Sequence, residues 1–194
     1  MQDKILFLDI DGVLNSEQSA YFWRKFVEKE EDTSIYTPNE QVTEENVKIR
    51  LSEEFCPIAV SNLHRIVAET GCKIVVSSTW RYGQDLEMMK EWFKYSPLIR
   101  DALIGKTPSL VFKHKMNEKD VQDALITVPR GVEIKAWLES HKVNYYNNNQ
   151  FAIIDDDDDM WPVERNFFSI EGRVGLTVFN AVEVINFLNK KKES

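Results

Sequence analysis

The chain has 194 residues, with 32 acidic residues (Asp and Glu) against 24 basic ones (Lys and Arg), and a formal net charge of -8. This balance disfavours a broad basic face for nucleic acid, although it leaves room for a local basic patch. The lack of a run of about 18 apolar residues excludes a membrane-spanning helix, and Asp3, Asp9 and Asp11 interrupt what would be the apolar part of a signal peptide. Two cysteines are too few for a disulfide scaffold, so we expect a protein of the reducing cytoplasm. We also expect no membrane contact and infer no obligate protein partner.

Short apolar runs alternate with amphipathic stretches along the chain, which is the pattern of a parallel sheet covered by helices. The predicted strands, in chain order, are residues 4–8, 73–76, 102–104, 151–154 and 166–170. The predicted helices are residues 57–68, 85–95, 132–138 and 180–188. Residues 1–194 are therefore expected to form one α/β domain, built on a Rossmann-like, doubly wound parallel sheet of about five strands.

Two segments do not fit this alternation. Residues 15–52 are charged and have few apolar positions, and residues 108–129 carry a basic stretch followed by a short amphipathic piece. We interpret residues 15–52 as a small cap inserted over one face of the domain, and residues 108–129 as a smaller insertion.

The first chemical signal is a pair of acids, Asp9 and Asp11, directly after the first predicted strand. Residues at that point lie at the carboxyl edge of the sheet, where open α/β sheets bind their ligands. Side chains two residues apart on extended backbone point to the same side, and two neighbouring carboxylates require a cation or a shared proton. Gly12 lets the chain turn away tightly, and we expect it to lie against the substrate. The pattern predicts a ligand site at the end of this strand.

A second group of acids follows the fourth predicted strand. Asp155 and Asp156 close that strand, whereas residues 157–159 are expected to face solvent. An EF-hand is excluded, because its glycine and its late bidentate glutamate are missing. If the first and fourth strands are neighbours, Asp9, Asp11 and Asp156 converge into an oxygen-rich pocket suited to Mg²⁺.

Hydroxyl side chains follow the second predicted strand, at Ser77, Ser78 and Thr79. Together with backbone N–H groups they can hold a phosphate where a helix begins. Arg81 adds a cation that can meet a phosphate through two N–H groups, although it could equally be a surface residue. Trp80, between them, is a candidate to line the site.

These motifs, in this order, resemble those of the haloacid dehalogenase superfamily of phosphohydrolases. The first motif of that superfamily is matched by Asp-Ile-Asp-Gly at residues 9–12. The resemblance implies that Asp9 is the nucleophile that accepts the phosphoryl group and that Asp11 is the general acid and base. It also implies that Ser78 is the hydroxyl of the second motif, with Ser77 as the alternative.

The remaining motifs follow later in the chain. The fourth motif is matched by Asp155 and Asp156, of which Asp156 is the better metal ligand by this resemblance. The third motif requires a cation shortly before the fourth, and Arg130 is the best placed residue, with Lys135 and Lys106 as alternatives.

More narrowly, the segments DIDGVLN, SSTWR, RGVEI and IIDDD resemble the phosphatase domains associated with Swiss-army-knife RNA repair proteins. The resemblance implies a phosphatase whose Mg²⁺ is held by Asp9, Asp156 and the backbone carbonyl of Asp11. The substrate stays open among a small phosphorylated metabolite, a nucleotide and a nucleic-acid end. The alternatives are a non-catalytic or regulatory domain of this fold and a topoisomerase-primase-like acidic site. The latter is disfavoured, because its paired acids would follow a later strand.

Overall fold

The computed structural model describes residues 3–22, 55–113, 125–146 and 149–190. Most of the predicted cap and the middle of the predicted smaller insertion lie outside these residues. No helix in the described part of the chain is both long and apolar enough to cross a membrane.

The main sheet has five parallel strands in the order β3-β2-β1-β6-β7. Their bounds are β1 (Ile5–Leu8), β2 (Lys73–Val76), β3 (Leu103–Lys106), β6 (Phe151–Asp155) and β7 (Phe167–Ser169). The five-strand parallel sheet is confirmed, and the ends of each strand lie within two residues of the predicted bounds. The register sets Leu8 beside both Val76 and Ile154, so β1 and β6 are neighbours, as the convergence of the acids requires.

The predicted helices are present as α3 (Pro57–Thr70), α4 (Leu86–Glu91), α6 (Arg130–Ser140) and α7 (Val178–Asn189). The helix predicted at residues 85–95 ends early, and α5 (Pro97–Ala102) follows it as a separate helix. Pro97 accounts for the start of α5, because a proline disfavours helical backbone at the residue before it but fits the first turn of a new helix. Among the short elements that were not predicted are α1 (Glu17–Phe22), η3 (Thr79–Arg81) and η4 (Glu164–Asn166).

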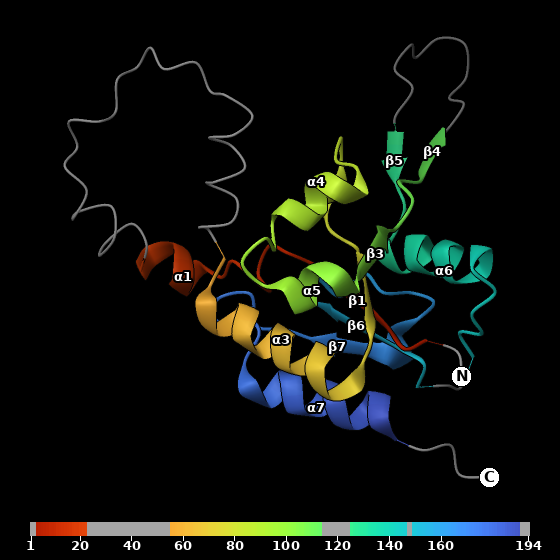
Figure 1. Ribbon diagram of the computed structural model, residues 1–194. Helices are drawn as coiled ribbons and strands as arrows, with labels where there is room; N and C mark the ends of the chain where they lie inside the picture. The colour runs from red at the N-terminus through yellow and green to blue at the C-terminus, as the bar shows by residue number, and fades with distance from the viewer. Residues whose placement is uncertain (1–2, 23–54, 114–124, 147–148, 191–194) are drawn as a thin grey trace, which may run out of the picture.

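Helices cover both faces of the sheet, as the doubly wound prediction requires (Figure 1). On one face, Leu6, Leu8 and Ile154 pack with buried residues of α3, α5 and α7 in one apolar cluster. On the other face, Phe7 and Ile153 pack with Ile134, Trp137 and other residues near α6 in a second cluster. Because side chains alternate between faces along a strand, one buried apolar run serves both layers. The sheet is therefore held rigidly from both sides at the strands that carry the acids.

A hairpin lies apart from the main sheet, within the predicted insertion at residues 108–129. Its strands are β4 (Val111–Lys113) and β5 (Leu125–Thr127), which pair antiparallel in a separate two-stranded sheet. Figure 1 shows the hairpin standing beyond β3 and the first turn of α6. The roles of this segment and of residues 15–52 as insertions remain predictions.

Candidate active site

Three carboxylates meet where β1 and β6 end. Asp9 follows β1, its backbone N–H donates to the Ile154 carbonyl (3.1 Å), and Asp155 is the last residue of β6. One oxygen from each of Asp9, Asp155 and Asp156 lies within 4.8 Å of the others. β1 lies between β2 and β6, where the order of the strands reverses, and open α/β sheets bind ligands at such a point.

A cavity of about 420 Å³ opens over these carboxylates. Its lining residues are Asp9, Asp11, Thr79, Arg130, Asp155, Asp156 and Asp157. Six of these seven residues were predicted as site residues from the sequence. The seventh, Asp157, belongs to the acidic run expected to face solvent, and it is exposed as expected.

Two glycines enclose the side chain of Asp156. A Cβ atom on Gly12 would lie 2.1 Å from Asp156 Oδ2, and one on Gly172 would lie 2.4 Å from the same atom. Gly12 also has a φ of 68°, in the left-handed region that disfavours other residues. Gly12 was predicted to bind substrate, but what the structure shows is a residue that makes room for Asp156.

Arg130 is the cation that faces the carboxylates. Its Nη1 donates to Asp9 Oδ1 (2.8 Å) and to the Ser77 carbonyl, and its Nε lies 3.4 Å from Asp155 Oδ2. The two alternatives for the third-motif cation lie elsewhere: Lys135 pairs with Glu139 along α6 (3.7 Å), and Lys106 donates to backbone carbonyls. Neither lysine lines the cavity, so the geometry favours Arg130.

Asp159 fixes the start of the helix that carries Arg130, a contact the sequence analysis missed. Pro129 precedes α6 and provides no side-chain cap. Instead Asp159 Oδ2 accepts from the Arg130 backbone N–H (2.9 Å) and the Asp159 carbonyl accepts from the Gly131 N–H (3.1 Å). A Cβ on Gly131 would lie 2.2 Å from the Met160 carbonyl oxygen, so α6 and the loop after β6 are in close contact. The sequence did contain a signal for such a contact, because a helix that begins after a proline and has no capping residue needs acceptors from elsewhere in the chain.

Burial sets the protonation of the buried acids. Burial raises the pKa of Asp9 to about 6, although Arg130 and the Ser78 hydroxyl act to lower it. Burial and the neighbouring Asp9 raise the pKa of Asp155 to about 8, against the opposing effect of Arg130. One guanidinium therefore does not fully compensate two buried carboxylates, and the group has the character of a cation site.

The hydroxyl residues after β2 divide between different roles. The Ser78 hydroxyl is the one that interacts with the Asp9 carboxyl, and it also accepts from the Trp80 backbone N–H (3.4 Å). The Ser77 hydroxyl is buried with no hydrogen-bond partner in the described structure. Thr79 is exposed and lines the cavity. This favours Ser78 over Ser77 as the hydroxyl of the second motif.

The structure does not place Arg81 where the predicted phosphate contact requires it. Its side chain is 3% exposed and pairs with Glu133 at 2.5 Å. It also donates to the carbonyls of Ser78 (2.7 Å) and Thr107 (3.2 Å). Because these acceptors occupy the guanidinium, Arg81 stabilises the loop after β2 rather than a ligand. A buried acid three positions into α6 could not be recognised from the sequence as its partner.

Asp11 is exposed and held by two side-chain donors. The Trp80 indole Nε1 donates to Asp11 Oδ2 (2.8 Å), and Asn15 Nδ2 donates to Asp11 Oδ1 (2.9 Å). Trp80 therefore lies beside the site, as predicted, whereas the part of Asn15 was not foreseen.

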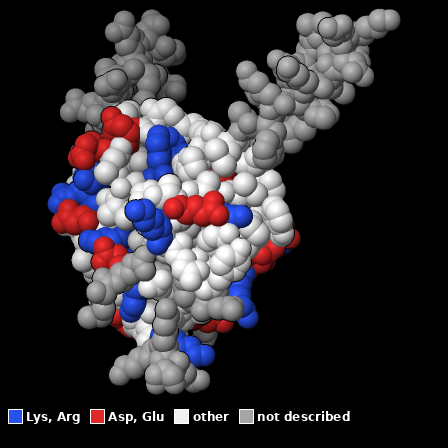
Figure 2. Space-filling view, turned by 90° about the vertical axis from the view of Figure 1, so that its right-hand side faces the viewer, with Lys and Arg blue, Asp and Glu red and all other residues white. Residues whose placement is uncertain are grey.

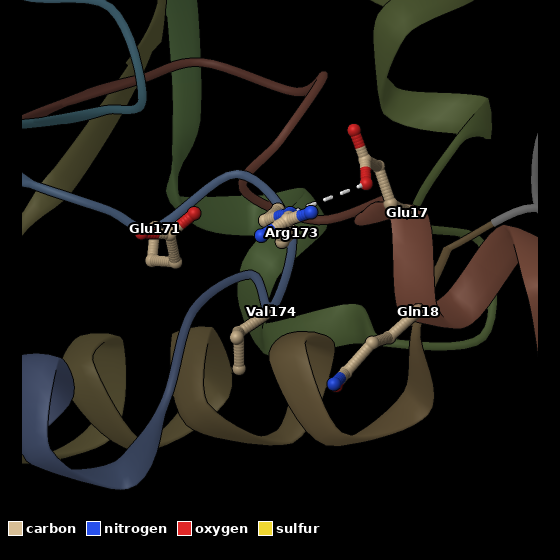
Figure 3. A pocket seen from close by; sticks show the side chains of 5 residues that line it. All are labelled: Glu17, Gln18, Glu171, Arg173 and Val174. Carbon is tan, nitrogen blue, oxygen red and sulfur yellow. Dashed lines mark ion pairs between the residues drawn. The ribbon is translucent and has the colours of Figure 1, made fainter.

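A second cavity, of about 550 Å³, adjoins the site through the turn at residues 171–174. Figure 3 shows its five lining side chains, with Arg173 reaching from this turn toward Glu17 at the start of α1. Their charged atoms lie 3.8 Å apart. Gly172, in the middle of the turn, is the residue that contacts Asp156. The turn thus separates a cavity of mixed charge from the acidic one.

The residues present fit a divalent cation. Three carboxylates offer oxygen atoms to one point, and Asp155 Oδ2 is buried without a hydrogen-bond donor. Oxygen ligands of this kind suit Mg²⁺. Asp11 is not in the group formed by these carboxylates.

Comparison with known proteins agrees with this site. The profile of the family described as "HAD domain in Swiss Army Knife RNA repair proteins" matches residues 5–181, and the chain belongs to this family. Its fold and its membership support a hydrolase role of the haloacid dehalogenase type. No curated protein sequence matches the chain.

Among solved structures, the chain is similar to a haloacid dehalogenase-like family hydrolase from Streptococcus pneumoniae. The two share 15% identity over 95% of this chain and 90% of that chain, with a TM-score of 0.42.

Removing Arg81 should destabilise the fold. Arg81→Met leaves Glu133 charged and buried, which costs about 3–5 kcal/mol of unfolding free energy in urea. The double variant Arg81→Met/Glu133→Met should lose less than the single one, since no buried charge is left unpaired. If the Arg81→Met protein keeps its stability but binds phosphate poorly, the result would instead support the predicted phosphate contact of Arg81.

Magnesium should stabilise the protein more at about pH 8 than at about pH 6. Because the pKa values of Asp9 and Asp155 are raised in the folded state, ionising them removes stability as pH rises from about 4 toward 8. Mg²⁺ binds the ionised forms and must displace protons at lower pH, weakening its affinity by about tenfold per proton and pH unit. Thermal unfolding at a fixed Mg²⁺ concentration measures this.

The control for that experiment is Asp155→Asn, which removes the carboxyl whose pKa is raised most. The pH dependence of the Mg²⁺ effect should shrink in this variant. Equal thermal shifts at both pH values in the unmodified protein would contradict the assignment.

Proposed function

We propose that the chain is a Mg²⁺-dependent phosphatase that hydrolyses a phosphomonoester through an aspartyl-phosphate on Asp9. The observation that carries the proposal is the position of the Asp9 carboxylate. It lies at the end of β1, lines an open cavity, and contacts Arg130 at 2.8 Å. A nucleophilic carboxylate beside a fixed cation suits attack on a phosphorus atom.

Each residue of the site has a chemical task in this reaction. An oxygen of Asp9 attacks phosphorus, and the bond from phosphorus to the leaving oxygen breaks as Asp11 gives that oxygen a proton. Asp11 then takes a proton from water, whose oxygen bonds to phosphorus and releases Asp9. Arg130 and Ser78 stabilise the negative charge on the transferring oxygens, an effect worth about 3 kcal/mol for a well placed donor.

Asp9, Asp155 and Asp156 would hold Mg²⁺, together with the backbone carbonyl of Asp11. When bound, the ion supplies positive charge that offsets the phosphate and the carboxylates around it. Asp155 is also suited to this task, because within the described residues its buried Oδ2 atom accepts no hydrogen bond and has only the ion pair with Arg130 at 3.4 Å.

The charge of the chain favours a small substrate. Figure 2 shows acidic and basic side chains interspersed over the described part of one face, without a broad basic area. With a net charge of -8, the electrostatic attraction that drives binding of long polynucleotides would be weak. A small phosphorylated metabolite, a nucleotide or a short nucleic-acid end fits this charge, and the family's setting in RNA repair proteins adds weight to the latter two. Both described cysteines are free, which fits the reducing cytoplasm proposed as its location.

Asp9→Asn should abolish turnover. Loss of a nucleophile costs at least about 1000-fold in kcat, measured as phosphate release from an aryl phosphate with Mg²⁺. The fold should survive, because replacing a buried acid of raised pKa by a neutral amide removes a desolvation cost.

The matched control is Asp158→Asn, an equivalent change at an exposed residue of the acidic loop after β6. It should keep its activity. Full turnover by Asp9→Asn, or turnover by the unmodified protein that persists with a chelator present, would refute the mechanism. A panel of nucleotides, sugar phosphates and oligonucleotides with 3′-phosphates then identifies the substrate class.

A further inference from the structure

The general acid of the proposed reaction is exposed to solvent. Asp11 is exposed, whereas Asp9, Ser78 and Asp155 are buried. An exposed carboxylate on its own rotates freely, and each wrong orientation reduces the fraction of molecules that can transfer a proton. Asp11 therefore needs partners that fix its plane.

Two side-chain donors meet the two oxygens of Asp11 from different elements. Asn15 comes from the same turn as Asp11. In this turn the Gly12 N–H donates to the Asn15 carbonyl (3.2 Å), and the backbones of Asp11 and Asn15 form an isolated β-bridge. Trp80 comes from η3, after the neighbouring strand, and its indole N–H reaches Oδ2 at 2.8 Å. An indole N–H is only ever a donor, so this contact persists whether Asp11 carries a proton or not.

Trp80 is itself held firmly. Its ring lies 5.8 Å from the ring of Phe55 and meets the ring of Trp92 edge-on at 5.8 Å. Trp92 is 4% exposed and packs in the main apolar cluster. The neighbouring Cys56 N–H donates to the Leu14 carbonyl (2.7 Å), which joins the Phe55 segment to the turn that carries Asp11. The indole ring is therefore held in place, with its N–H directed at Asp11.

We propose that Trp80 is a positioning residue for Asp11, which holds the carboxyl group in the orientation that delivers its proton to the leaving oxygen. This inference rests on the proposed function. With Oδ1 engaged by Asn15 and Oδ2 by Trp80, each oxygen keeps one further lone pair, and the proton travels on one of them. The indole contributes no proton and contacts no substrate atom in this role.

The test compares two substrates of one enzyme. An alkyl phosphate needs a proton on its leaving oxygen, whereas p-nitrophenyl phosphate releases a stable anion and needs little help. Trp80→Phe keeps an aromatic ring in the cluster but removes the N–H donor. It should lower kcat/KM on the alkyl phosphate at least about tenfold and change kcat/KM on p-nitrophenyl phosphate less than about threefold. The ratio kcat/KM is compared because it reports the steps up to the aspartyl-phosphate and leaves out the later attack of water, in which Asp11 serves both substrates alike.

The matched control is Trp92→Phe, which removes an indole from the same cluster without touching Asp11. It should change the two rates by the same factor. Loss on both substrates by one factor in Trp80→Phe, or the same selective loss in both variants, overturns the role of Trp80 and leaves the phosphatase intact. Absence of turnover by the unmodified protein on both substrates with Mg²⁺ refutes the proposed function and this inference with it.

A spectroscopic readout tests the contact without turnover. The chain has five tryptophans, so few indole N–H resonances appear in a ¹⁵N spectrum, and the one lost in Trp80→Phe belongs to Trp80. Asp11→Ala removes its acceptor and should move this resonance more than any other indole signal. An unmoved Trp80 resonance would overturn the inference.

Discussion

The structure depends on placing more negative charge at one edge of the sheet than its own cations neutralise. Asp9 and Asp155 end adjacent strands inside the folded protein and share Arg130 as their cation. Much of the nearby architecture follows from this constraint. Asp159 fixes the helix that presents Arg130, and Gly12 and Gly172 give Asp156 the space to join the group. An unbalanced acidic cluster stays available to a cation from solution, which a fully paired one would not.

Residues 80 and 81 show that neighbours in the sequence can have different structural roles. Trp80 is half-buried and directs its polar edge to Asp11, whereas Arg81 is buried and turned to Glu133. The short helix η3 makes this possible, because consecutive residues on a tight helix point in different directions. A charged side chain near a phosphate motif is thus not enough to assign a phosphate contact. Whether such a side chain binds phosphate depends on the hydrogen-bond acceptors that already surround it.

The sequence was sufficient for the sheet, most helices and the central acids, since these depend on local patterns. Buried apolar runs mark β1 and β6, and the acids directly after them follow from chain order alone. The partners of Asp11, Arg130 and Arg81 were missed, apart from the general location of Trp80. Each is a contact between segments far apart in the chain or within an irregular turn, such as Asp159 with the start of α6. No periodicity marks such pairs, because they arise only once the layers pack.

The Arg81–Glu133 pair also reaches the base of the hairpin formed by β4 and β5. Glu133 Oε1 accepts from the Leu110 N–H (2.9 Å), and Arg81 donates to the carbonyls of Thr107 and Pro108. The chain leading into the hairpin is thus anchored before the hairpin begins. Because the pair is buried beside the loop after β2, changes in the chain beyond Leu110 can leave that loop unaltered. The buried ion pair thus separates the loops at the carboxyl edge of the sheet from the predicted insertion that follows them.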